Sequence, residues 1–510
     1  MIYGVGLDLV EIARIMDTVQ RQPRFPERIL SEQELERYHN YTTERRRIEF
    51  LAGRFAVKEA FSKALGTGIG KEITFKQIHC ENDARGKPTI QMAGYHVHVS
   101  ITHTEHYAAA QVILEQQWMN IERGRMTIMS EKYYRTTTMK VNLDAITENY
   151  YALTKLQPNK TMMPVVKANA YGLGSIQIAQ HLSQLGAEFF CVATLDEAIE
   201  LRMHGIKEKI LILSSIPPDA INKAIQHRVA VTVPSRAWLE AATAEIDEDN
   251  VKTLWLHIKV DTGMNRLGVK DIEAYHDIIN FIHSHKNLVF EGAFSHFHSA
   301  DEDNDSAHMQ YERFEEIIES TEHPTYIHMQ NSAGTLRFNP SLCNAFRPGI
   351  ALYGYYPSAF IEKIATAQLA PAVQLVTEVM EVKSLIKGET VGYGQTYTAP
   401  EDMTIALLPI GYADGYLRSM QGANVRIGTT ECEIVGRVSM DRTAIRVPAT
   451  VQMGEEVILI DDQAHTSQSV ESLAAQQQTI NYEVLCNIGR RVPRVYFVQE
   501  MVEISNELLK

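Results

Sequence analysis

Cysteine is scarce in this sequence and scattered along it. The 510 residues include five cysteines, an odd number, with no CxxC pair among them. They are Cys80, Cys191, Cys343, Cys432 and Cys486. Disulfide frameworks and structural zinc sites both need cysteines at paired spacings, so neither is expected here. Reduced thiols in the cytoplasm are the simplest interpretation.

The sequence also lacks an excess of basic residues and any long apolar run. Its 49 Lys and Arg residues against 63 Asp and Glu residues give a net charge of −14, which disfavours nucleic acid as a partner. No stretch of about 18 apolar residues is present, so we expect no membrane span. The first residues are acidic where a signal peptide is basic. We expect a cytoplasmic protein of about two to four domains.

The first part of the chain, residues 1–116, reads as a compact α+β domain. Strand patterns at residues 2–8, 89–91, 97–101 and 108–114 surround a helical pattern at residues 54–66. Residues 117–138 show no clear period, and we interpret them as a linker because both flanks look self-sufficient. An ordinary long loop within one domain is the alternative.

From residue 139 the pattern changes to short apolar strands that alternate with amphipathic helices. Eight candidate strands lie at residues 163–167, 189–193, 210–213, 230–233, 254–260, 290–295, 325–328 and 345–346. This alternation predicts a (β/α)8 barrel over residues 139–370. Residues 371–510 lose the helical segments and read as a mostly β domain, with strands such as 406–408, 432–438 and 457–460.

Three short motifs carry the chemistry of the first domain. Asp8 ends the first strand, Glu59 and Lys63 lie four residues apart on one helix face, and His103 follows a late strand. Two carboxylates from separate elements can hold Mg²⁺, which takes its other oxygens from water and phosphate. Taken singly, each feature is more typical of a helix surface, a turn or a structural histidine.

Taken together and in this order, the motifs resemble the holo-acyl-carrier-protein synthase family of phosphopantetheinyl transferases. The resemblance covers residues 1–116 and includes GVGLDLVEIAR from Gly4, FPERIL from Phe25, RFAVKEAFSKALGTG from Arg54 and VSITHT from Val99. The resemblance implies that Asp8 and Glu59 bind Mg²⁺ and that Lys63 stabilises charge on the leaving phosphate. It further implies a coenzyme A site lined by Arg14, Arg28, Arg54, Gly66, His103 and Thr104. A serine of acyl carrier protein is the implied acceptor, and trimers are the family's usual assembly.

In the barrel, the segment PVVKANAYG places Lys167 at the end of the first predicted strand. Barrel enzymes keep their active sites at that end of the strands. Partial burial there favours the neutral amine that a Schiff base requires. An isolated strand-end lysine is more often a surface residue, so the neighbouring residues decide the interpretation.

The KANAYG segment resembles the pyridoxal-phosphate attachment segment of alanine racemases, and the resemblance continues for about 370 residues. Further matches are KVDTGMNRLG from Lys259, SHF from Ser295, NSA from Asn331, RPGIALYG from Arg347, GYG from Gly392, GYADG from Gly411, GRVSMD from Gly436 and NYE from Asn481. The resemblance implies a barrel and a β domain that bind pyridoxal phosphate and interconvert L- and D-alanine.

The resemblance also implies a role for each matching residue. Lys167 would carry the cofactor and act as one acid/base, and Tyr393 would act as the other on the opposite face of the substrate. The phosphate would be bound by Tyr171, Ser332, Tyr482 and the backbone of Gly349 and Ile350. Arg347 would face the pyridine nitrogen.

Supporting roles fall to five further positions under the same resemblance. His296 and Arg266 would support Arg347 and Tyr393, and Lys259 would be a carbamate paired with Arg266. Met440 would bind the substrate carboxylate, and Tyr412 would contribute to the substrate site. Tyr412 is equally well read as a channel or packing residue. In this family the lysine and tyrosine come from different subunits, which implies a homodimer with Tyr393, Tyr412 and Met440 entering the partner's site.

Other functions fit parts of the pattern. One alternative is a broad-spectrum amino-acid racemase whose N-terminal module is only structural. A decarboxylase is disfavoured by Arg347, because that chemistry benefits from a protonated ring nitrogen. A simple cofactor carrier is disfavoured by the β domain that bears Tyr393.

Overall fold

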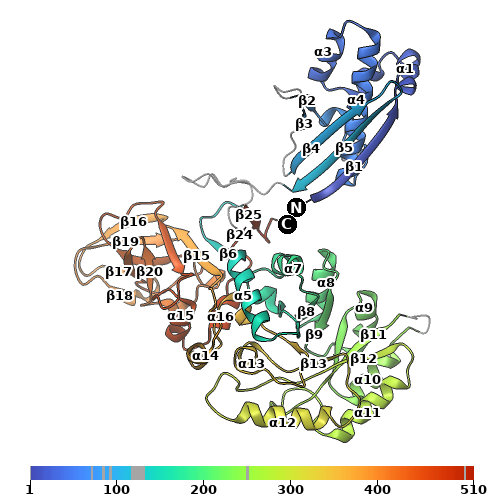
Figure 1. Cartoon of the computed structure of the whole chain (residues 1–510). Coiled ribbons are helices and arrows are strands. Elements are labelled where there is room, and N and C mark those ends of the chain that lie inside the picture. The colour runs from blue at the N-terminus through green and yellow to red at the C-terminus, as the bar shows by residue number, and fades with distance from the viewer. Residues whose placement is uncertain are drawn as a thin grey trace. The chain divides into compact units, whose positions relative to one another are not determined.

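The computed structural model describes residues 2–70, 73–82, 87–90, 95–116, 133–247, 252–498 and 501–509. Residue contacts divide the chain into two compact units, residues 1–122 and 123–510, which are described separately (Figure 1). Of the predicted linker, residues 117–132 lie outside the described residues. No helix in the described part of the chain is long and apolar enough to cross a membrane.

The N-terminal unit is an antiparallel sheet of order β1-β5-β4 with one long helix, α4 (Glu44–Leu65), packed on it. The strands are β1 (Ile2–Glu11), β4 (Tyr95–His103) and β5 (Tyr107–Gln116). Smaller elements are α1 (Ile12–Arg21), α2 (Phe25–Ile29), α3 (Glu32–Asn40) and the hairpin β2 (Cys80–Asn82) with β3 (Pro88–Ile90). The predicted helix at residues 54–66 is the second half of α4.

Two glycines explain the close packing of β1 on α4. A Cβ on Gly6 would lie 1.9 Å from the carbonyl oxygen of Ala60, and one on Gly4 would lie 2.0 Å from that of Ala64. The helix backbone therefore rests directly on the strand. This approach brings Asp8 of β1 beside Lys63 of α4.

The second unit contains the predicted barrel, a parallel sheet of order β7-β14-β13-β12-β11-β10-β9-β8. Val165, which follows β7, forms a bridge with Cys191 of β8, the strand at the opposite end of this order, and so closes the sheet. The strands are β7 (Thr161–Met162), β8 (Phe189–Val192), β9 (Lys209–Ile212), β10 (Ala230–Val233), β11 (Leu254–Lys259), β12 (Leu288–Phe294), β13 (Tyr326–His328) and β14 (Ala345–Phe346). The barrel prediction is confirmed, but the first strand was predicted wrongly at residues 163–167. Strand β7 ends at Met162, Val165 forms only an isolated bridge, and a turn begins at Lys167.

Helices surround the barrel (Figure 1). They are α5 (Leu143–Leu156), α6 (Lys167–Tyr171), α7 (Ser175–Gln184), α8 (Leu195–Met203), α9 (Ile221–Gln226), α10 (Arg236–Ala244), α11 (Ile272–His283), α12 (Ser306–Ile318), α13 (Ser332–Arg337) and α14 (Ala359–Ile364). The short turn η3 (Ile350–Tyr353) follows β14.

The mostly β domain is built on a seven-stranded sheet of order β21-β20-β23-β15-β6-β24-β25. Its strands are β6 (Thr138–Asn142), β15 (Val373–Glu378), β20 (Asn424–Ile427), β21 (Thr430–Glu433), β23 (Glu456–Ile460), β24 (Arg494–Val498) and β25 (Met501–Ser505). β6 precedes the barrel in sequence, yet it pairs with β15 and β24 in this sheet. One continuous hydrophobic core joins the barrel to the β domain.

Smaller elements complete the β domain. They are β16 (Glu381–Leu385), β19 (Met403–Leu408) and β22 (Thr443–Val447) in a second sheet, the pair β17 (Thr390–Val391) and β18 (Tyr397–Thr398), the turns η4 (Tyr393–Gln395) and η5 (Tyr412–Asp414), and the helices α15 (Val470–Gln477) and α16 (Asn481–Cys486).

Candidate active sites

The lysine predicted to hold the cofactor begins a left-handed turn. After Lys167, the residues Ala168, Asn169, Ala170 and Tyr171 have φ of +52°, +54°, +50° and +58°. A left-handed conformation costs a non-glycine residue roughly 1–2 kcal/mol. The surrounding structure must hold these residues in place, and such strain gathers at functional sites.

Contacts from both parts of the unit hold this turn. The Glu197 carboxylate accepts hydrogen bonds from the backbone amides of Ala168 (2.6 Å) and Ala193 (2.7 Å). A Cβ on Gly172 would lie 2.5 Å from the carbonyl oxygen of Leu485 in α16, so the β domain presses on the end of the turn. Glu197 was not among the site residues predicted from the sequence. Its signal was a helix-capping pattern, in which Thr194 is followed three residues later by Glu197.

The Lys167 amine is half-buried, and burial lowers its pKa. The positive charge of Arg266 lowers the pKa further, whereas the carboxylate of Glu197 opposes the shift. The neutral form of the amine is therefore more populated than in a free lysine. A Schiff base requires this neutral form.

Hydroxyl groups and backbone amides converge next to this turn. Ser332 Oγ accepts hydrogen bonds from the amides of Gly349 (2.9 Å) and Ala351 (3.2 Å), on either side of Ile350. A Cβ on Gly349 would lie 2.2 Å from the Tyr171 hydroxyl, so that hydroxyl lies against the same backbone. The Tyr482 ring, from α16, lies 5.9 Å from the Tyr171 ring. The structure thus brings together all five residues that the resemblance assigns to the phosphate.

Arg347 is buried at the centre of a second group of contacts. Its Nη2 donates to the carbonyl oxygens of Ser295 (2.8 Å) and Met329 (3.2 Å) and approaches His296 Nδ1 at 3.4 Å. Its Nη1 bonds His328 Nδ1. None of these partners within the described chain is a carboxylate. Burial lowers the pKa of Arg347 to about 10, so the guanidinium stays charged at neutral pH.

The residues around Arg347 are arranged to tolerate its charge. Burial, and then the charge of Arg347, place the pKa of His296 well below its usual range, so His296 is neutral and can accept a hydrogen bond. Lys259 ends β11, is buried and donates to the Val260 carbonyl at 2.8 Å. Burial, and then Arg347, lower the pKa of Lys259 to about 7. A cradle of hydroxyl groups and backbone amides, a half-buried amine and a buried cation fit the groups of pyridoxal phosphate.

Three of the predicted racemase residues lie on the surface of the β domain instead. Tyr393 is 72% exposed, Met440 52% and Tyr412 40%. Gly392 and Gly394 flank Tyr393 with φ of +73° and +75°, a conformation that favours glycine and turns the tyrosine outward. Arg266 is also exposed, although its charge acts on Lys167. Large side chains held out in this way are typical of a surface that another chain covers.

In the N-terminal unit, the predicted metal residues lie together. Lys63 Nζ bonds Asp8 Oδ1 at 2.7 Å and the Leu7 carbonyl at 3.3 Å. Burial, and then the charge of Asp8, raise the pKa of Glu59. Two carboxylates that repel each other in this way fit a divalent cation. Among the described residues, no set of three or more His, Cys, Asp or Glu side chains is grouped for a metal, so water and phosphate would supply the other ligands.

The predicted coenzyme A residues are brought together only in part. Arg54 and His103 line one cavity of about 240 Å³. Arg14 and Arg28 are exposed on α1 and α2, Gly66 caps α4 with φ of +81°, and Thr104 forms the turn between β4 and β5. Arg54 is largely engaged inside the domain, where it pairs with Glu34 at 3.6 Å and bonds Asn82 at 2.5 Å.

Lys58 was not among the predicted site residues, and it is fully buried in this domain. It bonds Glu34 at 2.5 Å and the carbonyl oxygens of Ile29 and Phe75. These contacts tie α4 to α2 and α3, so Lys58 has a structural role.

Comparison with known proteins agrees with this arrangement. Residues 141–357 and 372–496 match the family models for the alanine racemase N-terminal and C-terminal domains. An alanine racemase from Staphylococcus epidermidis is 55% identical over 382 residues, which are 75% of this chain and all of that protein. The chain belongs to the alanine racemase family. Residues 4–115 match the 4'-phosphopantetheinyl transferase superfamily model, so this member carries a second enzyme domain at its N-terminus.

Solved structures show the same fold for the racemase part. The alanine racemase from Bacillus anthracis with bound L-Ala-P has a TM-score of 0.71 and 38% identity, and the match covers 74% of this chain and 99% of that one. A histidine racemase from Leuconostoc mesenteroides has a TM-score of 0.67 and 28% identity, covering 72% and 99%.

Proposed function

We propose that the racemase part interconverts L-alanine and D-alanine with pyridoxal phosphate as cofactor. The observation that carries this proposal is the convergence of Lys167, the phosphate cradle around Ser332 and the buried Arg347. The identity of 55% to the Staphylococcus epidermidis alanine racemase supports alanine as the substrate.

The chemistry needs one proton-handling group on each face of the substrate. Bound pyridoxal phosphate makes the substrate Cα–H acidic by accepting electron density into its ring. The Lys167 amine handles the proton on one face and the Tyr393 hydroxyl on the other, so a proton removed from one side returns on the other. Arg347 would face the pyridine nitrogen and, as a cation that keeps its own proton, would leave that nitrogen unprotonated. This would limit electron withdrawal and favour return of the proton to Cα. The backbone amide of Met440 binds the substrate carboxylate.

The exposure of Tyr393, Tyr412 and Met440 supports a homodimer in which these residues complete the partner's site. Lys259 supports a further proposal, that its amine is carried as a carbamate beside Arg266. Its pKa of about 7 leaves the neutral amine available to react with carbon dioxide. Incubation with ¹³C-bicarbonate should give a carbamate signal in the ¹³C spectrum that Lys259→Met lacks.

A broad-spectrum racemase is the second candidate. The solved histidine racemase with the same fold shows that a relative of 28% identity is named for another amino acid. A panel of L-amino acids separates the two cases. Turnover of alanine alone supports the first candidate, and comparable turnover of other amino acids supports the second.

The decisive test of the racemase proposal uses two variants. Lys167→Ala should abolish the absorbance of lysine-bound cofactor and the activity. Tyr393→Phe should keep that absorbance and slow racemisation by about 10²-fold or more, the usual contribution of a general acid/base. Full activity in Tyr393→Phe would refute the two-group mechanism.

For the N-terminal domain, we propose Mg²⁺-dependent transfer of 4'-phosphopantetheine from coenzyme A to a serine of acyl carrier protein. The pairing of Asp8 with Lys63 and the raised pKa of Glu59 support the metal site. Arg14, Arg28, Arg54, Gly66, His103 and Thr104 would surround coenzyme A. Incubation with coenzyme A, Mg²⁺ and apo acyl carrier protein should add the mass of phosphopantetheine. No gain with several carriers would leave a structural module.

The assembly and organisation of the fusion follow as further proposals. Val5, Leu7 and Leu9 expose one apolar face of β1, which suits contact with another chain. We propose that further copies of this domain make that contact, in a trimer. We place the domain boundaries at residues 116, 138 and 370, although β6, at the start of the barrel segment, belongs to the sheet of the β domain. We expect the enzyme in the cytoplasm, without nucleic-acid or membrane partners, and the five unpaired cysteines fit a reducing compartment.

A further inference from the structure

A row of polar side chains crosses the barrel interior behind Arg347. Arg347 bonds His328 Nδ1, and His328 Nε2 lies 2.9 Å from His257 Nδ1. His257 Nε2 lies 3.3 Å from Glu291 Oε2, and the other oxygen of Glu291 accepts from Lys209 Nζ at 2.6 Å. Strands β9, β11, β12 and β13 supply the last four residues. None of these four contributes to the cradle or to the proton-handling groups.

The bonding pattern allows only one arrangement of protons. A guanidinium only donates, so His328 Nδ1 must accept. Burial and the charge of Arg347 place the pKa of His328 well below its usual range, and burial also lowers that of His257. Each neutral ring therefore carries its single proton on Nε2. Every hydrogen bond then points from Arg347 towards Glu291, which as a carboxylate only accepts.

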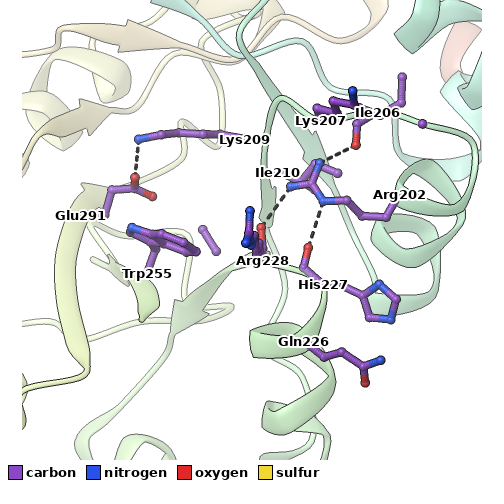
Figure 2. Close-up of a pocket in the computed structure, with 12 residues that line it drawn as sticks. Arg202, Ile206, Lys207, Lys209, Ile210, Gln226, His227, Arg228, Trp255 and Glu291 are labelled. Atoms are coloured by element: carbon purple, nitrogen blue, oxygen red, sulfur yellow. Dashed lines mark hydrogen bonds and ion pairs between the residues drawn. The ribbon is translucent and has the colours of Figure 1, made fainter. Parts of the chain in front are cut away.

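Glu291 is suited to accept the last hydrogen bond in this row of side chains. Although burial would raise its pKa, the hydrogen bonds from His257 and Lys209 bring the pKa below its usual value, so the side chain stays ionised. Its side chain is only 5% exposed, whereas that of Lys209 is 48% exposed. Lys209 and Glu291 face a cavity of about 560 Å³ that is also lined by Trp255 and Arg202 (Figure 2).

The surrounding structure makes room for the two rings and orients them. A Cβ on Gly292 would lie 2.2 Å from His257 Nδ1, so only glycine leaves space there. Tyr326 stacks on His257 with ring centres 6.2 Å apart, and Phe294 stacks on His328 at 4.9 Å. Apolar side chains in these positions would avoid the cost of burying charge. The stability of the fold alone therefore does not explain this chain of hydrogen bonds.

We propose that Glu291 and His257 are positioning residues for Arg347. The carboxylate fixes both imidazoles in one tautomer, and His328 then holds the guanidinium in the orientation that meets the ring nitrogen of the cofactor. This inference rests on the proposed role of Arg347 in cofactor binding.

The test compares two cofactors in the full-length apoenzyme at pH 8. One is pyridoxal phosphate, and the other is its analogue with C–H in place of the pyridine nitrogen. The ratio of their dissociation constants reports the contact of Arg347 with that nitrogen. The wild type should prefer pyridoxal phosphate by about tenfold or more, the worth of a hydrogen bond from a charged donor.

Glu291→Gln should reduce this ratio by about fivefold or more, a typical coupling between sites. The neutral amide can donate to His257 and reverse the chain, which would turn a His328 proton towards Arg347. His257→Phe interrupts the chain and should act in the same direction, with no further loss in the double variant. Lys209→Met breaks the same ion pair from the solvent side but keeps Glu291 and its hydrogen bond from His257, which lowers the pKa of Glu291 more than Lys209 does. Its ratio should therefore stay that of the wild type.

Three outcomes would overturn the proposal. A wild-type ratio in folded Glu291→Gln and His257→Phe would show that the chain does not act on Arg347. An equal loss in Lys209→Met would assign the effect to the ion pair. Equal affinity of the wild type for both cofactors would reject the contact of Arg347 with the ring nitrogen, and with it the proposed role of Arg347.

Discussion

The carboxylate of Glu197 accepts a hydrogen bond of 2.6 Å from the backbone amide of Ala168 and so holds the residue next to Lys167. One charged side chain on α8 thereby supports the left-handed turn and acts electrostatically on the lysine. Its two effects are separable, because one concerns stability and the other the pKa of the amine.

Glu197→Gln should lose one charged hydrogen bond, at a cost of about 1.5–3 kcal/mol in the free energy of unfolding. It should also lower the pKa of Lys167 further, because the carboxylate now raises that pKa. The pH midpoint for reconstitution of the apoenzyme with pyridoxal phosphate should shift down. Glu200→Gln, one turn along α8, is the control. An unchanged or higher midpoint in Glu197→Gln would contradict this account.

Lys259 should make the stability of the apoenzyme depend on pH. Its pKa is about 7 in the folded chain, well below the 10.5 of a free lysine. Between these values the unfolded chain binds a proton that the native chain does not, so the free energy of unfolding rises with pH across this window.

Urea unfolding at pH 7 and pH 9.5, in buffer free of carbon dioxide, should show this rise in the wild type. Lys259→Met should show a smaller rise, whereas Lys383→Met, at an exposed position, should match the wild type. Parallel behaviour of the wild type and Lys259→Met would argue against a neutral buried amine.

Gly6→Ala should loosen α4 in the N-terminal domain, because the new Cβ would lie 1.9 Å from the Ala60 carbonyl. Overpacking of this kind typically costs about 1–3 kcal/mol. Gly53→Ala, inside α4, meets only Ile101 at 3.5 Å and should stabilise the helix by up to about 1 kcal/mol. Hydrogen exchange of α4 amides in the full chain should speed up in the first variant and slow down in the second.

Magnesium binding should weaken as the pH falls through the raised pKa of Glu59, because protonation removes one of the two carboxylates. Asp8→Asn should weaken binding at neutral pH and also move this pH dependence down, since Asp8 is one cause of the raised pKa. Calorimetric titration with Mg²⁺ and coenzyme A measures both effects. Glu44→Gln, at the exposed start of α4, should bind as the wild type does.

The sequence predicted the parts of this protein that depend on local pattern. Apolar strands such as Ala230–Val233 and Phe189–Val192 lie where expected, because buried parallel strands are nearly continuous in apolar residues. Arg347 and Ser332 were found because they lie within motifs. The left-handed turn after Lys167 was not foreseen, because the contacts that hold it come from Glu197 and α16, far along the chain.

The chain of hydrogen bonds inside the barrel was not predicted either, because it depends on the pairing of strands that are distant in sequence. His257 and Glu291 each interrupt an apolar strand, and that was the available signal. Only the register of β11 on β12, and of β12 on β13, shows that these side chains lie close to one another and to His328. In the N-terminal unit the motif located Arg54, but not its bond to Asn82 from a distant hairpin.

The position of β6 between β15 and β24 has a consequence for synthesis on the ribosome. Every strand of the β1-β5-β4 sheet lies within the first 116 residues, so that sheet can form while the remainder is still being translated. β6 must instead wait for β24, which begins only at Arg494, before both of its edges are paired. A nascent chain released before that point would carry a finished transferase domain and a racemase sheet with an open edge.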